Sequence, residues 1–582
     1  MKKIDIQKEE IVRHSLSHIM ASAVQELYPG TKFGIGPAIE NGFYYDFEFK
    51  NPINPEDLAK IEKKMKELLK KDISFKKKLV SKNEAKKIFS NQPYKLELIK
   101  ELPGKNVSIY QSGEFTDLCK GPHIKSSKEI PFDSFKLTKI AGAYWRGSEK
   151  NKMLTRIYGI GFENKSELDK YLKFQEEAEK RDHRILGQKL DLFSTSEEVG
   201  AGLVILHPKG AAIRGAIEDF WKKEHKKRGY QYVYSPHIGK LDIWKTSGHW
   251  EFYRENLYSP IDIEGVQYLL KPMNCPFHLQ VFKSKIRSYK ELPIRYCELG
   301  TVYRFEKTGT LHGLLRVRGF TQDDAHIFCT SQQLDKEIEK VIDLACFMLG
   351  TFGFSNFETE LSVRDPKNKK KYLGSDKIWQ KAENALEYAL KQKGLKYRRA
   401  EGEAVFYGPK IDIKLIDALG RGWQGPTIQV DFNLPEKFNL SYINEKGNKE
   451  RVVMIHHTVL GSIERFIGNL LEEYAGALPL WLAPIQVWII PIGSRHEDYA
   501  QKVKEELLKE NPDLRIEIKG ENETVSKKIR EGEIQKIPYL LVVGDEEIKE
   551  ESVRVRSKNK DLGMMKLDKF LEKINSEIRE KK

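Results

Sequence analysis

Histidine and cysteine side chains form two pairs whose spacing could support metal binding or acid–base chemistry. HSLSHIM carries His14 and His18, and TDLCKGPHI carries Cys119 and His123 further along the chain. Nitrogen and sulfur donors suit zinc, and four of them complete a structural site. The group is therefore a possible zinc site. A metalloprotease site is disfavoured, because Ser15 stands where H-E-x-x-H requires its general base.

A second group of possible ligands is spread over the middle of the chain. Cys275 lies in KPMNCPFH, His326 in DDAHIF, and His456 and His457 in MIHHTVLG. Their separation excludes a local zinc finger, so a shared site has to be assembled from separate strands or loops of one domain.

Arginine residues accompany this second group. YRFEKTGTLHGLLRVRGFTQDD alternates charged and apolar residues around a glycine-bearing turn, which predicts an antiparallel hairpin. Its Arg304, Arg316 and Arg318 could bind phosphate oxygens in a bidentate manner. Arg465, in GSIERFIGNLLEE, is one turn into a predicted amphipathic helix and adds another cationic side chain.

The elements that position these residues must belong to several domains, because 582 residues are too many for one hydrophobic core. The segment EEIVRHSLSHIMASAVQELYPG predicts a helix with His14 and His18 on one face, ending at Pro29 and Gly30. Residues 164–190 are highly charged and predict a connecting helix. The apolar run in WLAPIQVWIIPIG predicts the opening strand of a last domain. We expect domains at 1–163, 191–483 and 484–582.

Composition limits the class of protein. The chain has five cysteines, which favours a reducing cytoplasm over a disulfide framework. No apolar run is long enough to span a bilayer, so we expect a soluble protein without a membrane partner. The net charge of +15 is compatible with a polyanionic partner. Residues 491–582, however, contain 21 basic and 21 acidic residues, so bulk charge does not predict RNA binding there.

Three segments resemble the signature motifs of the class II aminoacyl-tRNA synthetases. YRFE followed by RVRGFTQDD is similar to motif 2, GSIERF to motif 3, and residues 207–236 to motif 1, which builds the dimer interface in that class. Together with KPMNCP, DDAHIF and MIHHTVLG, these segments make the chain resemble the threonyl-tRNA synthetase family from about residue 8 to the C-terminus.

The resemblance implies an α+β multidomain protein that acts as a threonine–tRNA ligase. An antiparallel-sheet catalytic domain (191–483) would lie between an N-terminal α/β editing domain (1–163) and a C-terminal α/β anticodon-binding domain (484–582). Many bacterial members begin with a ubiquitin-like domain. Because His14 already belongs to the editing motif, we expect that domain to be missing here.

The implied reaction is ATP-dependent attachment of L-threonine to tRNA(Thr) through a threonyl-adenylate. In this family one zinc ion per chain binds the amino group and hydroxyl of threonine, and three protein ligands leave it an open position. The resemblance assigns those ligands to Cys275, His326 and His456, and His457 should point away.

The resemblance also implies how ATP and threonine are bound. Arg304 would hold the α-phosphate, Arg465 the γ-phosphate, and Glu306 the adenine side, with Mg²⁺ accompanying the triphosphate. The residues expected to line the threonine pocket are Gln322, Asp324, Tyr407 and Gln424.

Serine differs from threonine by one methyl group, and a difference of that size supports only ~10–200-fold discrimination. The resemblance therefore implies a second site that hydrolyses mischarged seryl-tRNA(Thr). The residues assigned to that editing site are His14, His18, Tyr45, Lys95, Asp117, Cys119 and His123. A zinc ion bound by the two histidine and cysteine pairs is the alternative for this group.

The remaining partners also follow from the resemblance. tRNA(Thr) would be read by Glu547 and Arg556 in GDEEIKEESVRVRSK, and a homodimer would form through motif 1. A competing interpretation is a synthetase-like RNA-binding protein that has lost catalysis, but Arg304 and Arg465 are both present. A seryl or prolyl synthetase is disfavoured by the three-residue zinc set and by HSLSH.

Overall fold

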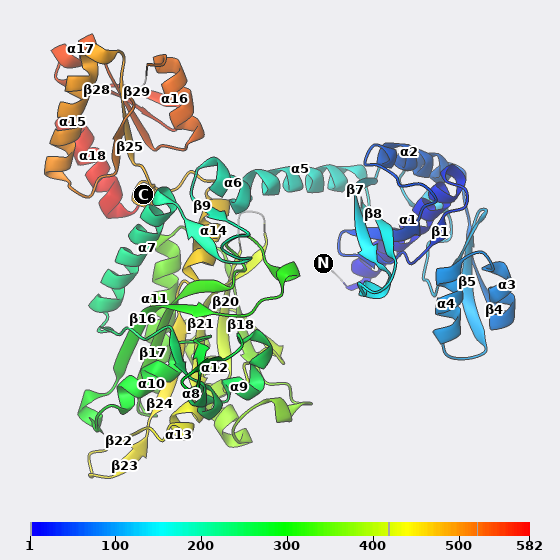
Figure 1. Cartoon of the computed structure of the whole chain (residues 1–582), viewed down its shortest axis with the longest axis horizontal. Helices are drawn as coiled ribbons and strands as arrows, with labels where there is room; N and C mark the ends of the chain where they lie inside the picture. The colour runs from blue at the N-terminus through cyan, green and yellow to red at the C-terminus, as the bar shows by residue number, and fades with distance from the viewer. Residues whose placement is uncertain (1–2, 417–419, 521) are drawn as a thin grey trace. The chain divides into compact units, whose positions relative to one another are not determined.

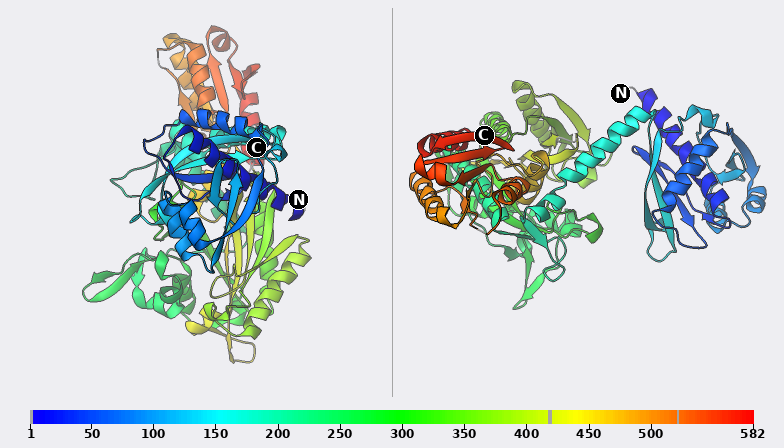
Figure 2. Two further views of the ribbon diagram at one scale, coloured as in Figure 1. Left: turned by 90° about the vertical axis from the view of Figure 1, so that its right-hand side faces the viewer. Right: turned by 90° about the horizontal axis from the view of Figure 1, so that it is seen from above.

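The structure is a computed structural model that describes residues 3–416, 420–520 and 522–582. The chain divides into two compact units, Met1–Glu176 and Glu177–Lys582, which we describe separately (Figure 1; further views in Figure 2). Among the described residues, no helix has the length and apolar character needed to cross a membrane.

The first unit is built around helix α1 (Lys3–Leu27), which ends two residues before the predicted stop at Pro29 and Gly30. The helix packs on an antiparallel sheet in the order β1-β3-β8-β7. Leu16 and Ile19 of α1, Phe43 and Phe47 of β3, and Met65 of α2 share one buried core. The elements of this layer are β1 (Lys32–Phe33), β2 (Ala38–Ile39, paired with β3), β3 (Gly42–Glu48), α2 (Asp57–Leu69), β7 (Phe135–Tyr144) and β8 (Met153–Gly161).

A smaller three-stranded sheet completes the first unit. Strands β4 (Phe75–Ser81), β5 (Asn106–Ser112) and β6 (Phe115–Leu118) are antiparallel. Helices α3 (Lys82–Ile88) and α4 (Pro93–Glu101) pack against them through Ala85 and Ile99. Strand β6 also contacts α1, so the CKGPH segment that follows it comes close to HSLSH.

The charged segment at 164–190 forms two helices, α5 (Lys165–Arg181) and α6 (His183–Lys189), rather than one. The interruption lies at Asp182, whose carboxylate accepts a hydrogen bond from the backbone N–H of Arg184 at 2.8 Å. Asp182 therefore acts as the N-cap of a new helix.

The second unit contains an eight-stranded sheet in the order β11-β16-β17-β24-β21-β20-β18-β19. Neighbouring strands are antiparallel except for the parallel pairs β11/β16 and β18/β19. The predicted antiparallel hairpin is confirmed as β16 and β17, but Arg304, Arg316 and Arg318 lie in the connection between the two strands and not on them. The strand bounds are β11 (Gln231–Tyr232), β16 (Ile294–Tyr303), β17 (Gly319–Cys329), β18 (Phe357–Val363), β19 (Tyr397–Glu401), β20 (Lys410–Ile416), β21 (Gly422–Asp431) and β24 (Val453–Thr458).

Four helices bury their apolar faces against this sheet in one continuous core. They are α7 (Pro208–Lys227), α11 (Leu334–Thr351), α12 (Asp376–Gln392) and α14 (Ile463–Glu473). The motif 1-like segment forms α7 and β11, and the motif 3-like segment begins α14.

Shorter elements surround the sheet and complete the site. Helix α10 (Cys275–Lys283) packs its Leu279 and Phe282 against Phe328 of β17 and Met454 of β24. This packing places the N-terminus of α10 beside those two strands. The other short elements are β9 (Phe193–Thr195), β10 (Val204–Leu206), β12 (Ile238–Lys240), α8 (Leu241–Ser247), α9 (His249–Phe252), β13 (Ile261–Ile263), β14 (Val266–Leu270), β15 (Arg287–Ser288), α13 (Asn433–Lys437), β22 (Ser441–Ile443) and β23 (Lys449–Arg451).

The C-terminal part is a five-stranded sheet in the order β26-β25-β27-β28-β29. Strands β25, β26 and β27 are parallel, which requires the intervening helices α15 and α16 as crossovers. Alternate residues of β25 pack on opposite faces: Val487 and Ile489 against α15 and α18, and Trp488 and Ile490 against α16. The bounds are β25 (Val487–Pro491), α15 (Glu497–Glu510), β26 (Ile516–Ile518), α16 (Val525–Ile534), β27 (Tyr539–Val543), α17 (Asp545–Lys549), β28 (Ser552–Ser557), β29 (Lys560–Lys566) and α18 (Leu567–Glu580).

Candidate active and editing sites

Sheet register brings the predicted residues of the catalytic domain together. His326 of β17 pairs with His456 of β24, and His456 pairs with Gln429 of β21. Because side chains alternate along a strand, Gln322 and Asp324 lie on the same face of β17 as His326. Paired positions on neighbouring strands thus place His326, His456 and Gln429 side by side on the sheet. We call these paired positions the ligand row.

Cys275, at the first position of α10, joins this row. The possible ligand atoms of Cys275, His326 and His456 all lie within 4.8 Å of one another, and all three residues are buried. His457 is held on the other side of its strand, where its Nε2 lies 2.8 Å from the hydroxyl oxygen of Tyr230. This contact agrees with the expectation that His457 points away from the other three residues.

Hydrogen bonds behind the two histidines indicate their tautomers. Nε2 of His456 lies 3.0 Å from Oδ2 of Asp431, so it carries the proton and donates it. Nδ1 of His326 lies 2.8 Å from Nδ1 of His278, whose Nε2 donates to Glu298 at 3.1 Å. His278 therefore accepts from His326, which leaves Nε2 of His326 without a proton.

This arrangement fits a bound zinc ion. Nε2 of His326 and Nδ1 of His456 lie 3.0 Å apart and face one another with lone pairs, an arrangement that a cation between them would stabilise. Burial lowers the pKa of His326 well below its ordinary range, which keeps the imidazole neutral and able to act as a ligand. The thiol of Cys275 has a pKa raised by burial, so metal binding there would have to displace its proton.

Arginine side chains converge beside the ligand set. Nη2 of Arg304 lies 3.4 Å from Oε1 of Gln322, and Nε of Arg465 donates to the carbonyl of Leu315 at 3.0 Å. The pKa of Arg465 is lowered by burial and by repulsion from Arg304 and Arg316. Bound phosphate groups would relieve that repulsion, so the part of the site near Arg304 and Arg465 suits a polyanion.

Glu306 and Asp324 have different environments. Glu306 forms an ion pair with Arg316, with Oε2 2.9 Å from Nη2. Asp324 is buried, which raises its pKa, and accepts a hydrogen bond from Nδ2 of Asn274 at 3.1 Å. Its other oxygen lies 3.7 Å from Nε2 of His326, so this carboxylate borders the ligand set.

Tyr407 and Gln424 differ in their distance from the ligand row. The Tyr407 ring is buried with its centre 5.3 Å from that of His456. The Gln424 amide instead donates to Oδ1 of Asp412 at 2.7 Å, whereas Gln429 is the direct neighbour of His456.

The predicted editing residues form a compact cluster in the first unit. Sγ of Cys119 lies 3.4 Å from Nε2 of His14 and 3.2 Å from Nε2 of His123. His18 is buried, and its Nδ1 has no hydrogen-bond partner among the described residues. The four residues also satisfy the distance requirement for a metal site, so geometry alone keeps that alternative open.

A buried network adjoins this cluster. The hydroxyl of Tyr45 donates to Oδ2 of Asp117 at 2.6 Å and accepts from Nζ of Lys95 at 3.0 Å. Lys95 also forms an ion pair with Asp117, and Nε2 of His18 lies 3.6 Å from that carboxylate. All seven predicted editing residues are therefore brought together.

Burial keeps the reactive groups of the cluster uncharged. It lowers the pKa of His14, His18 and His123, and it raises the pKa of Cys119 to about 11. At neutral pH the cysteine is a thiol, which argues against a thiolate nucleophile. The cluster is better suited to holding a water molecule between neutral imidazole nitrogens than to nucleophilic attack by Cys119.

Comparisons with known proteins identify three domains in the chain and also identify its relatives. Residues 258–474 match the tRNA synthetase class II core domain (G, H, P, S and T), 486–577 the anticodon binding domain, and 107–158 the threonyl and alanyl tRNA synthetase second additional domain. Threonine–tRNA ligase from Dehalococcoides mccartyi (strain CBDB1) is 54% identical over 98% of this chain and 97% of its own length. The chain belongs to the threonine–tRNA ligase family. It is thus an aminoacyl-tRNA synthetase with the expected α+β class II organisation.

Two further relatives support the same family assignment. The ligase from Borreliella burgdorferi (strain ZS7) is 50% identical over 99% of both chains. A crystal structure titled as the RNA binding domain of threonyl-tRNA synthetase from Cryptosporidium parvum Iowa II is 40% identical, covers 68% of this chain and 98% of that chain, and has a TM-score of 0.65.

Several residues beside the ligase's ligand set were not predicted from its sequence. Asp431 and His278 are hydrogen-bonded to His456 and His326, and Nε2 of His249 lies 4.0 Å from Sγ of Cys275. His278 has a usable signal, because it follows Cys275 by three residues on a helix and thus shares its face. Asp431 and His249 carry no comparable local pattern.

The two predicted anticodon contacts of the ligase have structural partners in its C-terminal sheet. Glu547 is buried, and its Oε2 accepts from the backbone N–H of Gly544 at 2.9 Å. Arg556 is half-buried, 3.9 Å from Glu533 and 3.8 Å from Asp561, and its Nε has no hydrogen-bond partner among the described residues. Glu547 is thus engaged at the start of α17, and the unpaired Nε of Arg556 is buried.

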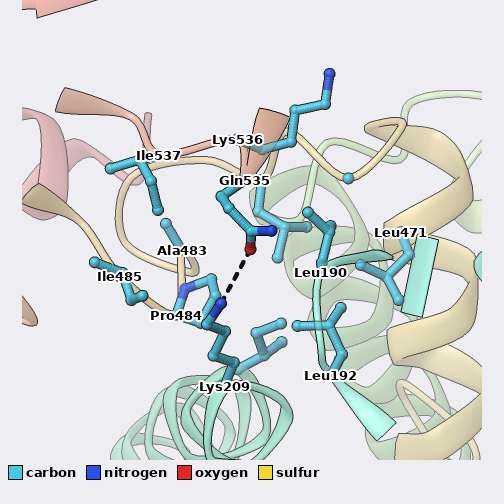
Figure 3. A pocket seen from close by; sticks show the side chains of 13 residues that line it. Leu190, Leu192, Lys209, Leu471, Ala483, Pro484, Ile485, Gln535, Lys536 and Ile537 are labelled. Carbon is cyan, nitrogen blue, oxygen red and sulfur yellow. Dashed lines mark hydrogen bonds between the residues drawn. The ribbon is translucent and has the colours of Figure 1, made fainter. Parts of the chain in front are cut away.

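Two other features of the ligase are structural rather than catalytic. Both ring nitrogens of His183 are engaged, Nδ1 with Glu472 at 2.7 Å and Nε2 with the N–H of Leu314 at 3.0 Å, so its ligand-like cluster holds α6 in place. A small pocket lined by Leu192, Gln535 and Ile537 (Figure 3) has a volume of about 10 Å³. That volume holds about one water molecule and no substrate.

Proposed function

We propose that the chain attaches L-threonine to tRNA(Thr) in two steps, through a threonyl-adenylate. The observation that carries the proposal is the Cys275, His326 and His456 donor set beside the convergent Arg304 and Arg465. The family relationship supplies the substrate, and the site supplies donors suited to an amino acid and to a triphosphate.

Threonine would be selected at the ligand row. Zinc held by Cys275, His326 and His456 would act as a Lewis acid that binds the amino group and hydroxyl of threonine. Asp324 lies beside the row and would accept a hydrogen bond from the substrate hydroxyl. Valine lacks that hydroxyl, so a site built for it would leave buried polar groups unpaired and reject it.

ATP would be activated by the arginines. The threonine carboxylate would attack the α-phosphorus, and pyrophosphate would leave with the electron pair of the broken P–O bond. We assign charge stabilisation at the α-phosphate to Arg304 and contact with the γ-phosphate to Arg465, with Mg²⁺ on the triphosphate. Glu306, through its ion pair with Arg316, would order the adenine side of the pocket.

We assign hydrolytic editing of seryl-tRNA(Thr) to the cluster in the first unit. The neutral imidazoles of His14, His18 and His123 would hold the water that attacks the ester, and departure of the tRNA hydroxyl would complete the hydrolysis. The Lys95, Asp117 and Tyr45 network would fix the serine side of the pocket. A metal-binding cluster remains the alternative that the test must exclude.

The remaining partners belong to the same proposal. We assign tRNA anticodon contacts to Glu547 and Arg556, dimer formation to α7 with β11, and a cytoplasmic location. These assignments follow the family pattern and the position of each element.

Threonine-dependent ATP–pyrophosphate exchange tests the proposal directly. Threonine should drive exchange, serine should drive it more weakly, and valine and proline should be close to background. Exchange that proline drives better than threonine, or that no amino acid drives in zinc-loaded protein, would overturn the assignment.

A further inference from the structure

Asp323 lies between two residues of the proposed active site but faces away from it. Along β17, Gln322 and Asp324 point to the substrate face, so Asp323 points to the opposite face. Its side chain is completely buried. A buried carboxylate without compensating donors is strongly unfavourable, so its partners indicate what it does there.

Four N–H groups point at this carboxylate. Oδ2 accepts from the backbone of Val459 and Leu460, both at 2.8 Å, and Oδ1 accepts from the backbone of Gly461 at 2.7 Å. The indole Nε1 of Trp221, from α7, adds a fourth bond at 3.1 Å. The two carboxyl oxygens accept all four bonds, and the three backbone donors counteract part of the rise in pKa, to about 8, that burial produces.

The three backbone donors form the turn between β24 and α14. Gly461 has a φ of +84°, which favours glycine, and its carbonyl accepts the backbone N–H of Asp323 at 3.1 Å. Ser462 then caps α14 by accepting the N–H of Arg465 at 3.2 Å. The carboxylate thus defines where α14 starts, and with it the position of Arg465.

The ligand histidine on β24 is held independently of this turn. His456 lies inside the ladder, paired with His326 on one side and with Gln429 on the other. The turn begins three residues later, outside those ladder bonds. Loss of the Asp323 carboxylate should therefore move Arg465 more than His456.

We propose that Asp323 is a positioning residue for ATP, acting through the turn Val459–Gly461 on Arg465 without touching substrate. The inference rests on the proposed function, because Arg465 is assigned there to the γ-phosphate. The inference predicts that loss of the Asp323 carboxylate raises the KM for ATP, while threonine binding and zinc content are preserved.

Asp323→Asn tests this inference in the full chain. One oxygen is replaced by an N–H₂ group that faces backbone donors, so part of the turn loses its acceptor. The KM for ATP in pyrophosphate exchange should rise about tenfold, which corresponds to 1.4 kcal/mol. The KM for threonine should stay within about twofold, because sites without shared partners couple only weakly and His456 is held by strand pairing that the variant leaves intact. Zinc per chain should be unchanged.

Two further variants sharpen the test. Trp221→Phe removes only the indole donor and leaves the turn bonded, so its KM for ATP should match the parent. Gly461→Ala strains the turn directly without touching Asp323, since the site has room for a methyl group but a left-handed φ. It should raise the KM for ATP as Asp323→Asn does, and it decides the question if Asp323→Asn fails to fold.

The outcomes separate this inference from the proposed function. A parent protein without threonine-dependent exchange would contradict the proposed function itself. A parental KM for ATP in folded Asp323→Asn, or in Gly461→Ala where the other does not fold, would overturn the inference alone. Equal losses for ATP and threonine, or loss of zinc, would also overturn it.

Discussion

Oδ2 of Asp431 lies 3.0 Å from Nε2 of His456, so this carboxylate determines which nitrogen of the imidazole faces His326. The other oxygen of Asp431 accepts the backbone N–H groups of Asn433 and Leu434 at 2.7 and 3.0 Å. The carboxylate is therefore itself held in place. Such outer partners orient ligands and increase their basicity.

Asp431→Asn should weaken zinc binding by about 10–100-fold, the usual effect of losing an outer carboxylate partner. The measurement is zinc retention against a competing chelator, with circular dichroism to confirm folding. Cys275→Ser, which removes a ligand itself, should abolish both zinc binding and threonine activation. Cys346→Ser, in a half-buried cysteine outside the site, should retain one zinc per chain. Unchanged zinc retention in Asp431→Asn would contradict the assigned role.

Arg304→Ala should reduce the rate of threonine-dependent pyrophosphate exchange by ~10²–10³, the typical effect of removing one donor that stabilises transition-state charge. The fold should survive, because this guanidinium makes only two side-chain hydrogen bonds among the described residues. Arg398→Ala provides a matched control, since that side chain is 74% exposed on β19. Exchange within a few-fold of the parent in Arg304→Ala would exclude the motif 2 role.

His14→Ala/His18→Ala should leave threonine activation nearly unchanged and allow serine to accumulate on tRNA(Thr). The reason is that one-methyl discrimination of ~10–200-fold would no longer be supplemented by hydrolysis. Serine charging, zinc per chain and thermal melting should be measured on one preparation. A parent with two zinc ions, and a variant with one, a melted first unit and no gain in serine charging, would instead establish the metal-binding alternative.

The first unit should lose stability as the pH falls below about 6.5. Burial lowers the pKa of His14 and His18 from the ordinary value of 6.5, so the unfolded chain binds more protons than the folded one below that pH. Each such histidine should reduce the free energy of unfolding by at most ~1.4 kcal/mol per pH unit there, and above that pH its contribution is complete.

Calorimetry of the full chain between pH 7.5 and 5.5 checks this pH dependence. The transition of the first unit should shift to lower temperature at pH 5.5, and the shift should shrink in His14→Ala/His18→Ala. His237→Asn, in the second unit, serves as the control and should retain the full shift. A transition of the parent that does not depend on pH would contradict the prediction.

Local patterns in the sequence predicted several of the elements that carry the candidate site residues. The helix carrying His14 and His18, the hairpin carrying Arg304 and the start of α14 each depend on periodicity and turn residues within a short segment. Those features can be read from neighbours in the chain. The single connecting helix over 164–190 was wrong in one respect, because Asp182 caps a second helix and helix capping competes with continuation.

The choice between Gln424 and Gln429 illustrates what a local pattern cannot decide. Both lie on β21 in the segment WQGPTIQVDF, and both have amide side chains. Sheet register makes Gln429 the neighbour of His456, while Gln424 donates to Asp412. Register depends on the pairing of strands that are distant in the chain, and a shift by one residue reverses every side chain.

The sequence by itself thus determined the family, the domain types and the chemical nature of the donors, because these depend on residue type and on spacing along the chain. Only the tertiary structure decided which groups complete the site. Asp431 behind His456, His278 behind His326 and Asp323 beneath the turn before α14 are brought to their partners by strand pairing and helix packing. Hydrogen bonds act over about 3 Å, so their partners are set by position in space and not by separation in sequence.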